Sequence, residues 1–186
     1  MTERPIILQD WEVRAFLAGR KTQVRRPMKP QPPRCFDPLR IPPGYLRHPF
    51  GTKLWVKETW WLSPSPAFTE GLGKAVVYRA DPIPKTRGGY PMITYRWRPS
   101  VHMPRWASRL TLEVTNVRVE RLQEISTADA IAEGMLNDGG GEYAIDGMSA
   151  AQVRFMDSWN SRYAKRGDGW DKNPWVWVPD CKVVTP

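Results

Sequence analysis

The sequence predicts an α+β domain built on a small closed or nearly closed β-barrel, with short flanking helices and long Pro-rich loop insertions. Three observations support this fold. Several segments show the apolar–polar alternation of strands, two short segments show helical spacing, and the 19 prolines gather in the connections between them. The chain has 186 residues, which is the size of one domain, so we expect residues 1–186 to form a single domain.

The first elements predicted are a strand and a helix. The apolar run 5–8 is the opening strand, and Asp10 is a suitable N-cap for the helix that follows. Gly19 is suited to ending that helix. Between residues 27 and 50 the density of proline excludes a helix or a central strand, so we expect an extended loop there.

The middle of the chain predicts three strands. Residues 54–60 alternate, with Leu54, Val56 and Glu58 on one face. Residues 75–79 form a short strand between two Pro/Gly-rich loops, 63–74 and 82–105. Residues 110–120 form the clearest strand, and its alternation slips near Asn116, which indicates a bulge.

The C-terminal third predicts two helices and a strand. Ser126 and Asp129 resemble a capping box that opens a short helix ending at Gly134. A flexible turn over 137–141 leads to a second helix over 149–163, and the last strand covers 175–184 with an interruption at Pro179. The apolar stripe expected on the second helix is Val153, Met156, Trp159 and Asn160.

The charge is asymmetric along the chain. The net charge is +9, but residues 1–60 carry +7, residues 61–120 carry +5 and residues 121–186 carry −3. This distribution favours oriented binding of a polyanion, of which nucleic acid is the commonest, although the charge could also serve solubility alone. Most of the ten tryptophans are expected in the core, and one or two exposed ones could stack on bases.

Neither a metal site nor a membrane segment is predicted. The two cysteines, Cys35 and Cys181, lie far apart, and there are only two histidines, so we expect no zinc and no cofactor. The chain has no apolar stretch typical of a signal peptide, and no apolar run long enough to cross a bilayer. We therefore expect a cytoplasmic protein with reduced thiols and no membrane partner. The sequence does not predict an oligomeric state.

The most informative segment is 19–26, Gly-Arg-Lys-Thr-Gln-Val-Arg-Arg, which places four cations beside a hydroxyl and an amide. Like charges this close repel one another, so the segment indicates an anionic partner or a lysine whose pKa its neighbours lower. The plainer interpretation is a solvated loop that follows a helix, whose C-terminal end tolerates cations well.

Residues 19–26 resemble the signature of the ASCH domain, a branch of the PUA-like superfamily. Further segments resemble the same family in order and spacing, so that the likeness runs from about residue 5 to residue 184. These segments are 54–60, 78–81, 97–109, 125–134 and 173–178. The 97–109 segment looks like that of the longer members associated with phages and prophages.

The resemblance implies a PUA-like β-barrel with a cleft beside the first helix. Family members are thought to bind RNA or modified nucleosides. Some are amidohydrolases that remove acyl groups from N4-acylated cytidine, and ribonuclease activity has been ascribed to others. The amidohydrolase site implied by the resemblance is a Lys-x-x-Thr pair with a later glutamate, which corresponds here to Lys21 and Glu133, with Val24 at the threonine position.

Valine has no hydroxyl, so Val24 cannot be a nucleophile. Thr22 carries a hydroxyl, but in an extended segment it lies about 6–7 Å from the Val24 position, where the resemblance places the nucleophile. That displacement is beyond the reach of a nucleophile that exchanges a proton with Lys21. Thr22 is therefore the weakest of the three candidate catalytic residues, beside Lys21 and Glu133. Val24 argues against the family's mechanism.

Further residues are candidates for ligand binding. Arg20, Arg25 and Arg26 could bind phosphate oxygens, although Arg25 or Arg26 could instead pair with Glu58 or Asp81. Glu58 could be a second acid, but a structural role beside a cation is favoured.

Two residues of the long loop are candidates at the mouth of the cleft. His102 could act there as an acid or base, with Arg105 beside it, although a lone loop histidine is more often a hydrogen-bonding strut.

Two functions from different classes follow. The first is a binding module that takes RNA or a modified nucleotide in a basic cleft. The second is a hydrolase, an N4-acylcytidine amidohydrolase or a ribonuclease, that uses Lys21 and Glu133. A cleft that binds a protein partner is a third, plainer option.

Overall fold

The computed structural model describes residues 3–33, 36–38, 40–41, 48–63, 75–82, 96–136 and 147–184. The predicted loops at 63–74, 82–105 and 137–141 lie partly or wholly outside these residues. The strands and helices are β1 Glu3–Ile7, α1 Asp10–Leu17, β2 Arg26–Pro27, β3 Lys53–Lys57, β4 Trp60–Ser63, β5 Ala75–Tyr78, β6 Thr111–Arg121, α2 Thr127–Ala132, α3 Ala150–Tyr163 and β7 Trp175–Val184.

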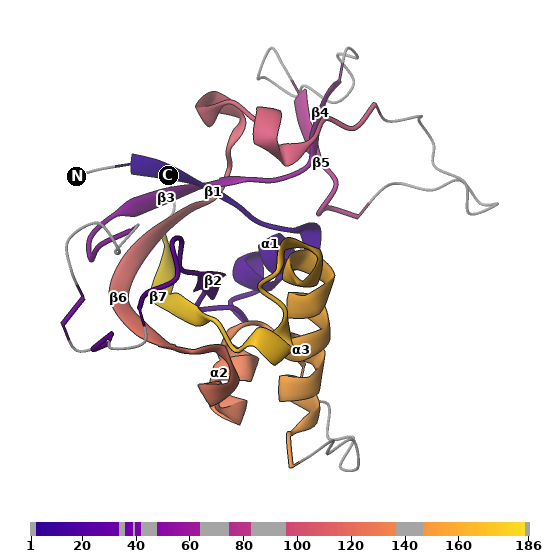
Figure 1. Ribbon diagram of the computed structural model, residues 1–186. Coiled ribbons are helices and arrows are strands. Elements are labelled where there is room, and N and C mark those ends of the chain that lie inside the picture. The colour runs from indigo at the N-terminus through magenta and orange to yellow at the C-terminus, as the bar shows by residue number, and fades with distance from the viewer. Residues whose placement is uncertain are drawn as a thin grey trace.

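A mixed five-stranded sheet forms the centre of the molecule, in the order β1-β3-β6-β7-β2. β1 and β3 are parallel and the other pairs are antiparallel. The sheet curves around α1, and α3 stands beside α1 (Figure 1). This arrangement confirms an α+β fold, and it places the basic segment after α1 between the sheet and the helices.

Of the closed or nearly closed barrel that was predicted, the closed form is not found among the described residues. β1 and β2 form the two edges of the sheet, and β2 pairs with β7 over two residues only. The side chain of Arg26 spans the gap, because its Nη2 donates to the carbonyl oxygen of Ile7 at 3.1 Å. A side-chain contact thus stands where a closed barrel requires a backbone ladder. We call this gap between β1 and β2 the seam.

The predicted strand over 54–60 is divided in two. Leu54, Val56 and Glu58 are buried, as the alternation predicted. However, the chain leaves the main sheet after Lys57, and from Trp60 it pairs with β5 in a separate two-stranded sheet. Glu58 lies at the bend between the two sheets.

Three helix starts were predicted, and one was misplaced by a residue. The N-cap of α1 is Gln9 rather than Asp10, because the Glu12 carboxylate accepts a hydrogen bond from the Gln9 backbone N–H at 2.8 Å. The capping box of Ser126 with Asp129 is confirmed, and Ser149 caps α3 in the same way. Each helix therefore begins where a side chain satisfies its free N–H groups.

The buried face of α3 differs from the predicted stripe, and the two share only Trp159. The buried residues of α3 are Ala151, Phe155, Trp159 and Tyr163. They face a core cluster that includes Trp170. Asn160 has a polar role instead, since its Oδ1 accepts the Trp170 backbone N–H at 2.8 Å.

The long antiparallel pair of β6 and β7 has one expected and one unexpected feature. The register slips between Val114 and Asn116, which confirms the predicted bulge. Pro179 does not interrupt β7, because it keeps its place opposite Val117 and its carbonyl accepts the Val24 N–H at 3.1 Å. Among the described residues, no helix is both long and apolar enough to cross a membrane.

Candidate functional site

The segment after α1 is held between α2 and β7. Gly19 takes a positive φ of 68°, which turns the chain out of the helix as predicted. Isolated bridges then join Lys21 to Glu133 and Gln23 to Asp180. The side chains of Lys21 and Gln23 are buried, whereas that of Thr22 is exposed.

Lys21 and Glu133, which the sequence resemblance paired, are in direct contact. The Lys21 Nζ lies 2.5 Å from Glu133 Oε2 and donates to the Glu133 carbonyl at 2.7 Å. The exposed fractions of the two side chains are 0% and 3%. The ammonium also lies 5.4 Å from the centre of the Trp11 ring and 5.8 Å from that of Phe16. Lys21 is therefore a buried cation with a carboxylate and two aromatic faces around it.

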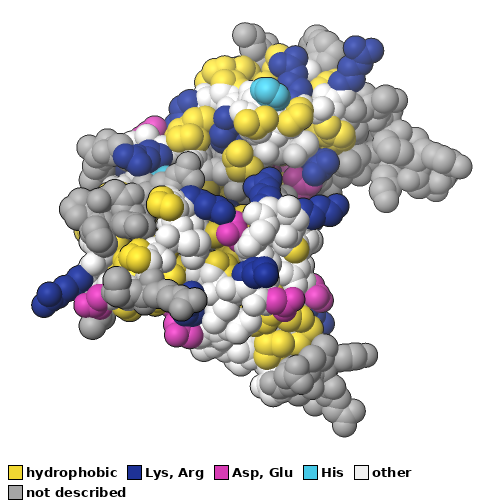
Figure 2. All heavy atoms as spheres, in the orientation of Figure 1, with side chains coloured by type: hydrophobic (Ala, Val, Ile, Leu, Met, Phe, Trp, Pro, Cys, Tyr) yellow, Lys and Arg dark blue, Asp and Glu magenta, His cyan; other side chains and the backbone are white. Residues whose placement is uncertain are grey.

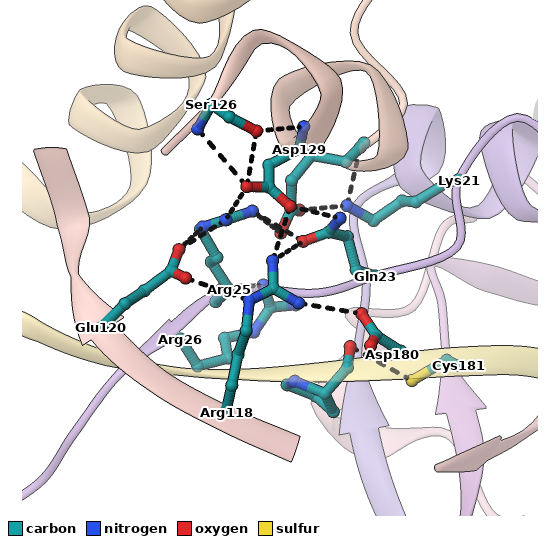
Figure 3. A network of polar contacts seen from close by, with 12 residues as sticks. Lys21, Gln23, Arg25, Arg26, Arg118, Glu120, Ser126, Asp129, Asp180 and Cys181 are labelled. Atoms are coloured by element: carbon teal, nitrogen blue, oxygen red, sulfur yellow. Dashed lines mark hydrogen bonds and ion pairs between the residues drawn. The ribbon is translucent and has the colours of Figure 1, made fainter. Parts of the chain in front are cut away.

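Arg25 is buried in the same network, which Figure 3 shows. Its Nη1 lies 3.2 Å from Glu133 Oε1, and its Nη2 lies 2.5 Å from Glu120 Oε1 and 3.5 Å from Asp129 Oδ2. Arg118 joins from β6, with contacts of 2.6 Å to Asp129 and 3.0 Å to Glu120. The guanidinium of Arg25 is thus occupied by partners within the fold.

The hydrogen bonds around Asp129 hold its pKa low. Partial burial raises the pKa of Asp129, but hydrogen bonds from Ser126 and Gln23, with the charges of Arg25 and Arg118, outweigh burial and lower that pKa to about 2. Asp129 therefore stays ionised over the whole physiological range and keeps this corner of the network anionic.

Glu12 is the second buried carboxylate of the site, with 2% of its surface exposed. It accepts hydrogen bonds from Arg162 at 2.5 Å and 3.2 Å, and Arg26 and Lys21 lie 3.5 Å and 3.9 Å away. Burial raises the pKa of Glu12, but the three cations outweigh it and lower that pKa to about 2. Glu12 thus ties α1, the basic segment and the end of α3 together.

A cleft of about 780 Å³ lies at the seam. The edges of β1 and β2 form one side, with Trp177 of β7, and the C-terminal end of α3 forms the other. Its charged and aromatic lining includes Arg26, Lys29, Arg162, Tyr163, Arg166 and Trp177. The carboxylate among its lining residues is Asp168, which lies 2.6 Å from Lys29. The cleft is therefore basic, with aromatic walls.

A small inner cavity of about 20 Å³ lies beside the buried network. It shares Arg26, Arg162 and Tyr163 with the cleft, and it also touches Glu12 and Glu133. This volume is enough for about one water molecule. Glu133 thus lines a cavity that shares three wall residues with the cleft.

The other candidates of the basic segment lie apart from the cleft. The Thr22 backbone is bonded to Ala132 and Cys181, and Thr22 lines neither the cleft nor the inner cavity. Arg20 is exposed and lines a separate hollow. Val24 is fully buried in the core.

Glu58 has a structural setting. It is bound by Arg109, with contacts of 3.0 Å to each of its carboxylate oxygens, and Arg109 also pairs with Asp81. The alternative pairing of Arg25 or Arg26 with Glu58 or Asp81 is therefore wrong. Burial raises the pKa of Glu58, and Arg109 opposes that shift.

His102 and Arg105 lie in short turns near the β4–β5 sheet. Both are exposed, and Arg105 pairs with Glu3 at 3.0 Å. Neither residue lines the cleft at the seam. Among the described residues, no group of three His, Cys, Asp or Glu side chains is arranged to hold a metal ion.

Sequence reasoning missed Glu12 and the cluster at the end of α3. Arg162, Tyr163 and Arg166 interleave cations with an aromatic ring over five residues. That interleaving is a pattern of nucleic-acid contacts, and it could have marked the segment. No local signal marks Glu12, which reads as an ordinary acidic residue of a helix's first turn.

No protein-family model and no curated protein matches the sequence. In structure, the chain is similar to the high-resolution crystal structure of an ASCH domain from Lactobacillus crispatus JV V101. The match covers 100% of this chain and 80% of that chain, at 14% sequence identity and a TM-score of 0.43. That likeness is to the family whose motifs the sequence resembles, and it carries no information about the ligand.

Proposed function

We propose that the protein binds RNA, or a modified nucleotide, in the cleft at the seam. The observation that carries this proposal is the lining of the cleft, where Lys29 and Arg166 are exposed beside Tyr163 and Trp177. Arg166 makes no ion pair with any described residue, so its charge is available to a ligand. A phosphate needs such cations, and a base needs an aromatic or apolar wall.

The deeper part of the cleft supports the same proposal. Arg26 and Arg162 share Glu12, so two cations face one carboxylate at the inner end of the cleft. The excess positive charge attracts an anion. The edge of β1 adds polar backbone groups beside the apolar side chain of Ile6, a combination suited to the edge and face of a base.

The test is the salt dependence of RNA binding by the natural protein and by Lys29→Ala/Arg166→Ala. For single strands, the slope of log K against log salt is about −0.7 for each phosphate neutralised. We expect the double variant to bind more weakly and to make the slope shallower by about 1.4. Both side chains are exposed, but Asp168 loses its Lys29 partner in this variant, so circular dichroism checks that the fold is kept.

Lys182→Ala is the matched control, since Lys182 is 62% exposed and lies outside the cleft. It removes a surface cation and should leave the slope unchanged. An unchanged affinity and slope in Lys29→Ala/Arg166→Ala would contradict the proposal.

Arg25→Ala with Arg26→Ala, which the sequence alone suggests as a test, is less informative. It removes buried partners of Glu133 and Glu12 and would reduce stability as well as binding.

A second candidate function is hydrolysis of a nucleic-acid-derived amide, such as an N4-acylcytidine. The specific observation in its favour is the Lys21–Glu133 contact beside a cavity that can take one water molecule. Glu133 would accept a proton from a water molecule while the oxygen of that water bonds to the acyl carbon. The C–N bond would then break, with Lys21 giving a proton to the leaving nitrogen. Because Val24 supplies no hydroxyl, water is the nucleophile in this scheme.

Hydrolysis of N4-acetylcytidine, followed by chromatography, tests this second function. Turnover by the natural protein that is lost in Glu133→Gln and in Lys21→Ala, with the fold retained, would support it. No turnover by the natural protein would contradict it and leave the binding proposal standing. Turnover gained only in Val24→Thr would indicate a cleft that has lost its chemistry.

A further inference from the structure

Gln9 lies between β1 and α1 and lines the cleft at the seam. Its backbone is used by the fold, since its N–H donates to Glu12 Oε2 at 2.8 Å and its carbonyl accepts the Val13 N–H at 3.0 Å. The side chain of Gln9 is half-buried and ends in an amide, which carries both an acceptor and a donor. The side-chain amide is therefore the part of Gln9 that can serve a ligand.

The orientation of this amide is fixed by Trp11, whose Nε1–H donates to Gln9 Oε1 at 2.6 Å. An indole nitrogen can only donate, so the amide oxygen faces Trp11 and the amide nitrogen faces away from it. The Trp11 ring is held in turn by a cation–π contact, because the buried ammonium of Lys21 lies 5.4 Å from its centre. Nε2 of Gln9 makes no hydrogen bond with a described residue. It is thus a preorganised donor whose partner is missing from the fold.

The carboxylates around Gln9 do not compete for this donor. Glu12 accepts hydrogen bonds from Arg162 at 2.5 Å and 3.2 Å, and Asp168 of the cleft lining lies 2.6 Å from Lys29. Each carboxylate is therefore engaged by a cation. The acceptor that fits beside Nε2 of Gln9 is one that the ligand supplies.

The positive charge around the cleft indicates which part of a nucleotide that acceptor belongs to. In Figure 2, Lys and Arg side chains form a broken band across the middle of the molecule, over the region where β1 leads into α1. A phosphate makes stronger hydrogen bonds with such cations than with a neutral amide. The neutral donor of Gln9 is therefore left for a neutral oxygen, which in a nucleotide is a carbonyl oxygen of the base.

We infer that Gln9 selects the base held in the cleft, because its Nε2 donates to a ring carbonyl oxygen of that base. This inference rests on the function proposed for the cleft. Uracil carries such an oxygen where cytosine carries an amino group, and guanine carries one where adenine carries an amino group. An amino group placed against Nε2 would leave two donors facing each other without an acceptor. Gln9 therefore favours uracil over cytosine and guanine over adenine.

The experiment measures the affinities of an oligouridylate and an oligocytidylate, each of eight nucleotides, at several salt concentrations. The two ligands carry the same number of phosphates, so their salt slopes should be equal and the ratio of their affinities reports the base. We expect the natural chain to bind the oligouridylate about tenfold more tightly, since cytosine loses one hydrogen bond and leaves a donor unpaired.

Two substitutions of Gln9 test its role. Gln9→Leu removes the donor and should bring the two affinities to within about twofold of each other. Gln9→Glu should invert the preference, because Trp11 can still donate to one carboxylate oxygen while the other accepts from the amino group of cytosine. The added charge should weaken both ligands alike and leave the ratio to report the base. Gln123→Glu is the matched control, since Gln123 is exposed and lies outside the cleft, and its ratio should equal that of the natural chain.

A natural chain that binds the oligocytidylate as tightly as the oligouridylate would overturn the inference while the cleft proposal stands. A preference for the oligouridylate that persists unchanged in both Gln9 variants would also overturn it, since another group would then select the base. Failure of the natural chain to bind either ligand would overturn both. Circular dichroism checks the fold of each variant, and an inverted preference in Gln9→Glu is a result that loss of structure does not produce.

Discussion

At the scale of single residues, the site is a set of buried charges that satisfy one another. Lys21, Arg25 and Glu133 are each withdrawn from water, and each has its partner within 3.2 Å. Removing charges from water is costly, and their mutual attraction offsets that cost only while every partner is present. Single substitutions in this network should therefore be strongly destabilising.

Glu133→Ala should lower the free energy of unfolding by about 3–5 kcal/mol, because it leaves Lys21 and Arg25 buried without their shared carboxylate. Urea denaturation measures this loss. The double variant Lys21→Met/Glu133→Leu should recover part of it, since it replaces the ion pair with apolar groups. A loss below about 1 kcal/mol in Glu133→Ala would contradict the description of a tightly coupled pair.

Acid should destabilise the protein through Glu12 and Asp129. The pKa of each is lowered to about 2, so their stabilisation is complete above the ordinary carboxyl pKa and is lost as the pH falls towards 2. Between pH 4 and pH 2, Glu12 should remove up to about 1.4 kcal/mol of unfolding free energy for each pH unit. Glu58 acts in the opposite direction, since burial raises its pKa.

Urea denaturation of the natural protein and of Glu12→Gln across this range measures the effect. Glu12→Gln should be less stable at neutral pH but should lose less stability on acidification. Equal pH dependence of the two proteins would show that the Glu12 carboxylate does not contribute.

At this scale, the sequence predicted a contact where a family motif linked the two residues. It did not predict ion pairs whose partners are brought together only by the folded sheet. Lys21 and Glu133 are 112 positions apart, and only the family resemblance brought them together before the structure. The alternative pairing of Arg25 with Glu58 or Asp81 was wrong, because its partners Glu120 and Asp129 lie on elements whose approach depends on the whole sheet. Local charge patterns do not encode such contacts.

At the scale of elements, the basic segment is fixed by its backbone as much as by its charges. The Thr22 N–H donates to the Ala132 carbonyl at 2.8 Å, and the Cys181 N–H donates to the Thr22 carbonyl at 2.7 Å. The segment is thus anchored to the end of α2 and to β7. Gly134, two residues after the end of α2, allows this close approach, since its φ is +93° and a Cβ there would lie 3.3 Å from the Lys21 Cβ.

Gly134→Ala should therefore destabilise the protein by about 1–3 kcal/mol, through backbone strain and through the close contacts with Ala15 and Lys21. Gly147→Ala is a matched control, because Gly147 also has a positive φ, of +78°, but a Cβ there would meet no atom within 4 Å. The control should lose only about 1 kcal/mol. Equal losses measured by urea denaturation would show that the packing against Lys21 is unimportant.

Elements were predictable where their signals are local. Alternation located β6, and capping residues located the starts of α2 and α3. The division of the strand after Lys57 was not predictable, because both halves continue the same alternation and the break depends on pairing with β5. The buried stripe of α3 was also missed, since the composition of the helix does not reveal which neighbour it packs against.

At the scale of the whole molecule, the cleft lies where the sheet fails to close. The seam leaves the edge of β1 uncovered by a backbone ladder, and the end of α3 supplies cations across from it. The asymmetric charge predicted a polyanion-binding face built from the first two thirds of the chain, but Arg162 and Arg166 of the cleft come from the acidic C-terminal third. The position of the cleft could not be predicted, because it depends on whether the edge strands β1 and β2 meet.

The most direct test of the account is hydrogen exchange of the natural protein with and without an oligouridylate of eight nucleotides. Binding at the seam should slow amide exchange in residues 3–9, which include β1, and in residues 160–168, which include the end of α3, since a bound strand would cover both. Slower exchange confined to the β4–β5 sheet and the turns around His102, with β1 and α3 unchanged under saturating RNA, would contradict the claim that the seam is the binding site.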